Sequence, residues 1–90
     1  MSVAAFIRVQ GLVQAVGFRY FVYGVATRLG LNGYVRNAYD GSVEIEAEGE
    51  RSLIEELIKD VKVGPRAAHV TEVSVTWKEP QNQFHHFDIR

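Results

Sequence analysis

Apolar residues follow two different periods along this chain, and the order of these periods limits the folds available to it. They recur at every second position in residues 3–10, 42–48 and 70–78, which is the pattern of strands with one buried face. They recur every three or four positions in residues 18–29 and again in residues 53–61, which predicts two amphipathic helices. The sequence therefore predicts strands and helices that alternate along the chain.

Glycine and proline residues mark where these elements end. Gly30 is well placed to cap the first helix, and Gly64-Pro65 ends the second. Asp40-Gly41 is a tight-turn signal that would join a short strand at residues 32–37 to the next alternating segment as a hairpin. Residues 84–89 can form a short final strand.

The resulting order is strand, helix, strand, strand, helix, strand and a short extra C-terminal strand. This order predicts an α+β fold, the ferredoxin-like βαββαβ sandwich, with two helices on one face of a mostly antiparallel sheet. A chain of 90 residues suits one domain, so we expect residues 1–90 to form it. The fold supports many functions, so it does not assign one.

Composition excludes several kinds of site. The chain has no cysteine, which rules out disulfides, thiolate catalysis and cysteine-bound metals. Its apolar stretches are too short to span a membrane, and the first residues lack the long apolar run of a signal peptide. We therefore expect a cytoplasmic protein without a membrane partner, and a monomer by default.

The charges are unevenly distributed. Residues 1–39 contain four arginines and no acidic residue, whereas residues 40–90 contain six basic and eleven acidic residues. A binding site for a small anion in the first part is the natural interpretation. Chance segregation in a short chain is the alternative that composition leaves open.

The segment from Gly11 to Gly17 links the first predicted strand to the first helix. Backbone N–H groups at a helix start have no intrahelical partners and carry the positive end of the helix dipole, so such a loop can hold a phosphate. Arg19 stands in this first turn, where acidic residues are usually favoured, and a bound anion would compensate for its charge. An arginine that extends into water is the simpler alternative.

Asn37 is predicted to lie beside Arg19. A helix over residues 18–30 is about 18 Å long, and a strand over residues 32–37 returns about 20 Å. The end of that strand therefore comes back to the start of the helix. The Asn37 side chain could position a water molecule there, although a role as a turn residue is an alternative.

Two segments resemble signatures of the acylphosphatase family. Residues 11–19, Gly-Leu-Val-Gln-Ala-Val-Gly-Phe-Arg, are similar to its phosphate loop, usually G-x-V-Q-G-V-x-F-R. Residues 33–44 are similar to its second signature, G-[FYW]-V-x-N-x-x-D-G-x-V-E, and the closing Phe87-Asp88-Ile89 fits as well. The resemblance extends over nearly the whole chain.

This resemblance implies a metal-independent hydrolase that needs no cofactor and converts small acyl phosphates to a carboxylate and inorganic phosphate. Arg19 and Asn37 would be catalytic, Arg19 by binding the phosphoryl group and Asn37 by orienting the attacking water. The loop amides that would bind the substrate phosphate belong to Gln14, Ala15, Val16, Gly17, Phe18 and Arg19. Phosphoryl transfer depends mainly on positioning and charge stabilisation, which such a set supplies.

Ala15 departs from the family pattern, which has glycine at this position. If the loop requires a positive φ here, alanine costs roughly 1–2 kcal/mol or changes the loop conformation. We therefore expect reduced activity, and a non-catalytic or weakly active anion-binding module on the same fold is the alternative function.

Other interpretations are less favoured. An RNA-binding domain of similar topology would need a basic sheet face, whereas Glu44, Glu46 and Glu48 are predicted to be exposed on one face of the third strand, so no nucleic-acid partner is expected. The three histidines are spaced as surface residues rather than as metal ligands. Tyr20 and Tyr23 are predicted to be partly buried amphipathic side chains, although they could flank a ligand.

Overall fold

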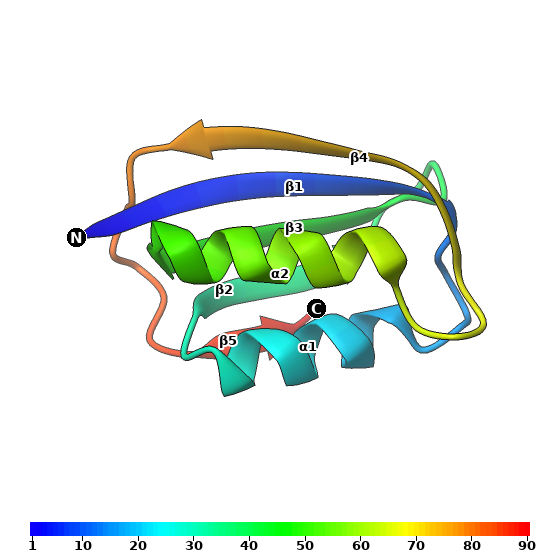
Figure 1. The fold of residues 1–90 in the computed structure, drawn as a ribbon, viewed down its shortest axis with the longest axis horizontal. Coiled ribbons are helices and arrows are strands. Elements are labelled where there is room, and N and C mark those ends of the chain that lie inside the picture. The colour runs from blue at the N-terminus through cyan, green and yellow to red at the C-terminus, as the bar shows by residue number, and fades with distance from the viewer.

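The computed structural model describes residues 1–90 and contains one five-stranded sheet with two helices. The elements are β1 (Ser2–Leu12), α1 (Phe18–Arg28), β2 (Asn32–Asn37), β3 (Val43–Glu50), α2 (Arg51–Val63), β4 (His69–Lys78) and β5 (Phe87–Ile89). The strand order is β4-β1-β3-β2-β5, and only β2 and β5 pair in parallel. Both helices cover the same face of the sheet (Figure 1). The predicted α+β fold is confirmed, including the short C-terminal strand.

The ends of α1 follow from local backbone geometry. The helix ends at Arg28, two residues earlier than predicted, because Gly30 adopts a left-handed φ of 72° after the C-cap residue Leu29. At the other end, Gly17 directly precedes the helix with a φ of 77°. These two glycines limit α1 to the span between the loop and β2.

The hydrophobic core lies between the sheet and the helices. Its fully buried side chains include Ile7, Val9, Val35, Val43 and Ile45 from the strands and Phe18, Val22, Ile54, Leu57 and Val61 from the helices. Full burial of one such side chain contributes roughly 1.5–3 kcal/mol. The predicted periodic positions are therefore the ones that hold the helices on the sheet.

The last strand is shorter than predicted because Phe84 does not join the sheet ladder. β5 covers only Phe87–Ile89, and the Phe84 ring packs edge-on against the Tyr34 ring, with 5.9 Å between the ring centroids. The Arg90 guanidinium lies 4.2 Å from the centroid of the Tyr34 ring. Aromatic and cation–π contacts thus secure the C-terminal segment against β2.

The face of the sheet away from the helices differs from the prediction. Glu44, Glu46 and Glu48 are 8%, 7% and 6% exposed, so the expectation of three exposed carboxylates is wrong. Basic side chains from other strands of the sheet pair with Glu44 and Glu46. Arg8 and Arg36, on the two strands beside β3, pair with Glu44, and Lys78, on β4 beyond β1, pairs with Glu46. The Gln81 N–H donates a hydrogen bond to Glu48 Oε2 at 2.8 Å. Repulsion by free carboxylates therefore no longer argues against RNA binding. The three glutamates balance the charges of Arg8, Arg36 and Lys78, however, so this face has no excess of positive charge from these residues.

Candidate active site

The β1–α1 loop, residues 13–17, and the β2–β3 turn, residues 38–42, lie at the same end of the sheet (Figure 1). A cavity of about 160 Å³ at this end is lined by Val13, Ala15, Gly17, Phe18, Arg19, Tyr20 and Asn37. Arg19 comes from the first turn of α1 and Asn37 from the last residue of β2. The prediction that these two residues lie close together is confirmed.

The chain bends at Gly11, near the end of β1, before it enters this loop. The pairing of β1 with β4 shifts register between Gln10 and Gly11, which is a β-bulge. Gly11 has a φ of 124°, and a Cβ on it would collide with the backbone of His69 and Thr71. Only glycine fits at this bend, which explains the glycine near the end of β1.

The loop leaves several backbone donors without partners. Residues 14–17 belong to no helix or strand, and none of their N–H groups donates to a protein acceptor. No side chain caps α1, and its first turn contains no acidic residue. Successive N–H groups at a helix start form a concave site that favours an anion.

Ala15 is strained in the way that its departure from the family pattern predicts. Its φ is 62°, in the left-handed region that glycine adopts without steric penalty. The loop therefore has a conformation that a glycine at this position could adopt. The free-energy penalty for an alanine in this region is roughly 1–2 kcal/mol.

Arg19 is half-buried and held by the end of the chain. Its Nη1 donates a hydrogen bond to the backbone O of Arg90 at 3.0 Å. The interpretation of Arg19 as a side chain that extends freely into water is therefore wrong. A guanidinium has five N–H donors, and this bond uses one of them at a residue that lines the cavity.

Asn37 carries the one buried side-chain polar atom in the structure that has no hydrogen-bond partner. This atom is its Oδ1. A buried acceptor without a donor costs about 1–3 kcal/mol, and such atoms need a specific explanation. Asn37 also lines the cavity, so this side chain lies at the wall of the site.

The loop and the two polar side chains can be compared with known proteins. The family model described as acylphosphatase matches residues 5–89. The chain belongs to the acylphosphatase family. The acylphosphatase of Caldanaerobacter subterraneus subsp. tengcongensis is 47% identical over 89 residues, which are 99% of both chains. The acylphosphatase of Pseudothermotoga lettingae is 48% identical over 86 residues, which are 96% of both chains.

A solved acylphosphatase structure supports the same assignment. The crystal structure of acylphosphatase from Bacillus subtilis is 41% identical to this chain and has a TM-score of 0.94. The match covers 100% of this chain and 99% of that one. The two folds therefore agree over the whole length of this chain.

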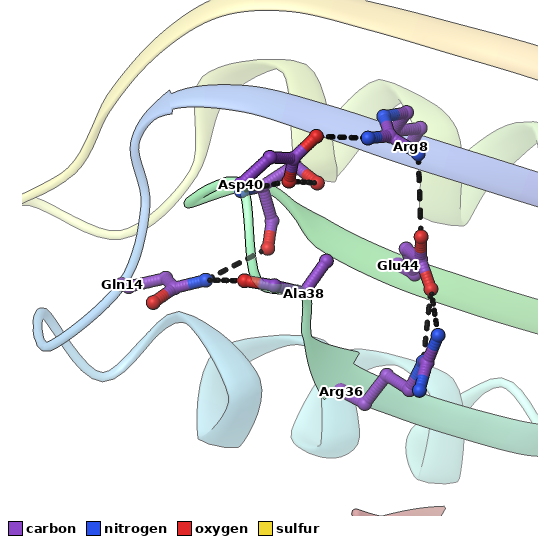
Figure 2. A network of polar contacts seen from close by, with 7 residues as sticks. Arg8, Gln14, Arg36, Ala38, Asp40 and Glu44 are labelled. Atoms are coloured by element: carbon purple, nitrogen blue, oxygen red, sulfur yellow. Dashed lines mark hydrogen bonds and ion pairs between the residues drawn. The ribbon is translucent and has the colours of Figure 1, made fainter.

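Only some of the residues predicted to bind phosphate line the cavity. Ala15, Gly17, Phe18 and Arg19 line the cavity, whereas Gln14 and Val16 do not. The Val16 side chain instead packs against the hydrophobic core. The side chain of Gln14 turns away toward the β2–β3 turn, where Nε2 donates to the backbone O of Ala38 at 2.8 Å and of Ser42 at 3.0 Å (Figure 2).

The β2–β3 turn is also fixed from within. Asp40 Oδ1 accepts hydrogen bonds from Ser42 Oγ at 2.6 Å and from the Ser42 N–H at 3.0 Å. These bonds, with the Arg8 guanidinium beside the carboxylate, lower the pKa of Asp40 from 3.8 to about 2. Arg8 also contacts Glu44, which in turn raises the pKa of Arg36 through a hydrogen bond and its charge (Figure 2).

Tyr20 and Tyr23 were both predicted to be partly buried. Tyr20 is 73% exposed and lines the cavity, so the prediction is wrong for this residue. Tyr23 is 39% exposed, so more than half of it is buried as predicted. The three histidines are exposed, and no three His, Asp or Glu side chains form a cluster suited to a metal ion. Neither helix combines the length and apolar character that a membrane crossing requires.

Proposed function

We propose that this protein hydrolyses acyl phosphates to a carboxylate and inorganic phosphate in the cavity between Arg19 and Asn37. The observation that carries the proposal is the shared position of three features. Ala15 and Gly17, whose backbone N–H groups have no partner, line one small site together with Arg19, which has unused donors, and Asn37, whose buried amide oxygen has no partner.

The loop and Arg19 would bind the phosphoryl group. Its oxygens would accept hydrogen bonds from the backbone N–H groups of residues 14–19, and the guanidinium would offset their negative charge. Donors that are fixed in advance stabilise charge in a transition state without reorganisation, and an arginine at such a site contributes about 10³–10⁵ in rate.

Asn37 would position the attacking water. Oδ1 accepts one hydrogen of the water, so an oxygen lone pair is directed toward the phosphorus. The bond between phosphorus and the acyl oxygen breaks, the carboxylate leaves with its electron pair, and the water proton passes to phosphate or solvent. A carboxylate is a weak base that needs no proton to leave, so a site whose lining contains no Asp, Glu or His can serve.

We propose that Ala15 affects folding more than catalysis. The expectation of reduced activity, and the alternative of a non-catalytic anion-binding module, both required a loop distorted by alanine. A φ of 62° supports the other outcome, in which alanine keeps the glycine-like loop conformation and the penalty falls on stability. Oligomeric state and cellular location remain predictions from the sequence.

The test of this function is hydrolysis of acetyl phosphate and of an aromatic acyl phosphate by the purified protein in EDTA. We expect undiminished turnover, competitive inhibition by inorganic phosphate, and little hydrolysis of p-nitrophenyl phosphate, whose leaving group is poorer. Strict dependence on an added divalent metal, or equal rates on the monoester, would contradict the proposed mechanism.

A further inference from the structure

The Gln14 side chain joins the two halves of the proposed site. Its backbone belongs to the phosphate loop next to Ala15, while its amide nitrogen reaches the turn that directly follows Asn37. The two bonds span 24 and 28 residues of sequence, so no local pattern reveals them. Figure 2 shows Gln14 on the loop directed at the backbone of Ala38.

A count of donors shows that Gln14 does not bind phosphate through its side chain. A glutamine NH₂ group has two N–H donors, and both are used, one on Ala38 O and one on Ser42 O. The remaining polar atom, Oε1, is an acceptor and would repel a phosphate oxygen. The side chain therefore has no donor to offer an anion.

The same count shows that Gln14 completes the turn. Ala38 O also accepts from the Gly41 N–H at 3.2 Å, and Ser42 O also accepts from the Ala38 N–H at 2.8 Å. A carbonyl oxygen has two lone pairs, so the second acceptor position of each oxygen is occupied by Gln14. Loss of this side chain would leave both carbonyls one partner short, and one of them belongs to Ala38, the residue next to Asn37.

We propose that Gln14 is a positioning residue that sets the distance between the phosphate loop and the water-orienting Asn37. The inference rests on the proposed function, since it assigns Gln14 an effect only through Asn37. Misplacement of a reacting group by about 1 Å can lower a rate about 10²-fold, so a link of two hydrogen bonds between the halves of the site can control turnover.

A set of substitutions separates this role from simple packing. Gln14→Met keeps the length and removes the donors, Gln14→Glu keeps the shape but presents an acceptor to two carbonyls, and Gln14→Lys returns a donor. We expect kcat to fall about 10- to 10²-fold in Gln14→Met and further in Gln14→Glu. In Gln14→Lys we expect part of this loss to be recovered. The inhibition constant of inorganic phosphate should change less than about threefold in Gln14→Met, because the loop amides remain.

The decisive arm is a double-mutant cycle with Asn37→Ala. If Gln14 acts through Asn37, Gln14→Met should lower kcat by less than about twofold in the Asn37→Ala background. Independent losses that multiply would overturn the inference, as would a wild-type kcat in Gln14→Met. If Gln14→Met does not fold, the Gln14→Glu and Gln14→Lys pair decides, since equal rates in these two would overturn it.

The matched control is Gln10→Met, which makes the same change on an exposed β1 residue outside the cavity, and it should leave kcat unchanged. The wild-type assay separates the two proposals. No acyl phosphate turnover by the wild type would defeat the proposed function itself, whereas normal wild-type turnover with additive Gln14 and Asn37 effects would defeat only this inference.

Discussion

Arg19 and Asn37 line one cavity from different elements, Arg19 from the start of α1 and Asn37 from the end of β2. Their chemical situations differ, because Arg19 is a cation with donors to spare and Asn37 presents a buried oxygen without a donor. Arg19 can therefore bind a phosphoryl group, and Asn37 can accept a hydrogen bond from a water molecule. The predictions below test this division of roles.

Removal of the guanidinium should abolish most of the activity. We expect Arg19→Ala to lower kcat/KM by about 10³-fold or more and to weaken inhibition by inorganic phosphate, because the only cationic side chain in the cavity is lost. Steady-state kinetics with acetyl phosphate measures both effects. Arg28→Ala is the control on the same helix, and a comparable loss there would show that α1 rather than the guanidinium is responsible.

Asn37→Ala should separate turnover from anion binding. Its proposed partner is water, so we expect kcat to fall about 10²-fold or more while the inhibition constant of phosphate stays within about threefold. Parallel measurements of kcat and phosphate inhibition decide the point. If phosphate binding weakened as much as in Arg19→Ala, Asn37 would be a phosphate ligand and the assigned roles would be wrong.

Ala15→Gly should change stability more than rate. Glycine removes the penalty of a left-handed alanine, which stabilises the folded state by roughly 1–2 kcal/mol. The greater conformational freedom of glycine in the unfolded chain lowers the free energy of unfolding by about 0.4–1 kcal/mol. We expect a net gain of up to about 1 kcal/mol in the free energy of unfolding by urea denaturation, with kcat within about threefold. A rise in kcat of about 10²-fold would instead show that alanine misdirects a loop amide.

The turn should lose stability in acid. A carboxyl whose pKa is lower in the folded than in the unfolded state stabilises folding above its unfolded pKa and loses that contribution as the pH falls. For Asp40 the interval runs from 3.8 down to about 2. We expect the free energy of unfolding of Asp40→Asn to depend less on pH in this interval than that of the wild type, and parallel slopes in urea titrations would contradict it.

The sequence was sufficient for the parts of the site that depend on element order and length. Alternating and helical periods predicted the fold, and the similar lengths of the first helix and the following strand placed Asn37 near Arg19. The mismatch at Ala15 pointed to a left-handed residue, which has a φ of 62° in the structure. These features follow from local pattern or from one connection, which a single sequence contains.

Contacts between distant segments were not predictable in this way. The bonds from Gln14 to the turn, and the burial of Glu44 beneath Arg8 and Arg36, depend on which strands are neighbours and in what register. Strand order and register arise from packing of the whole chain, so one sequence without relatives does not reveal them.

The measurement that tests the central claim most directly is hydrolysis of an acyl phosphate in ¹⁸O-labelled water containing EDTA, followed by mass spectrometry of both products. A water held by Asn37 against a phosphoryl group bound by the loop and Arg19 attacks phosphorus, so the label should appear in inorganic phosphate. Label in the carboxylate would mean attack at the acyl carbon, and absence of hydrolysis would mean that the cavity is not a phosphatase site. Either result would contradict this account.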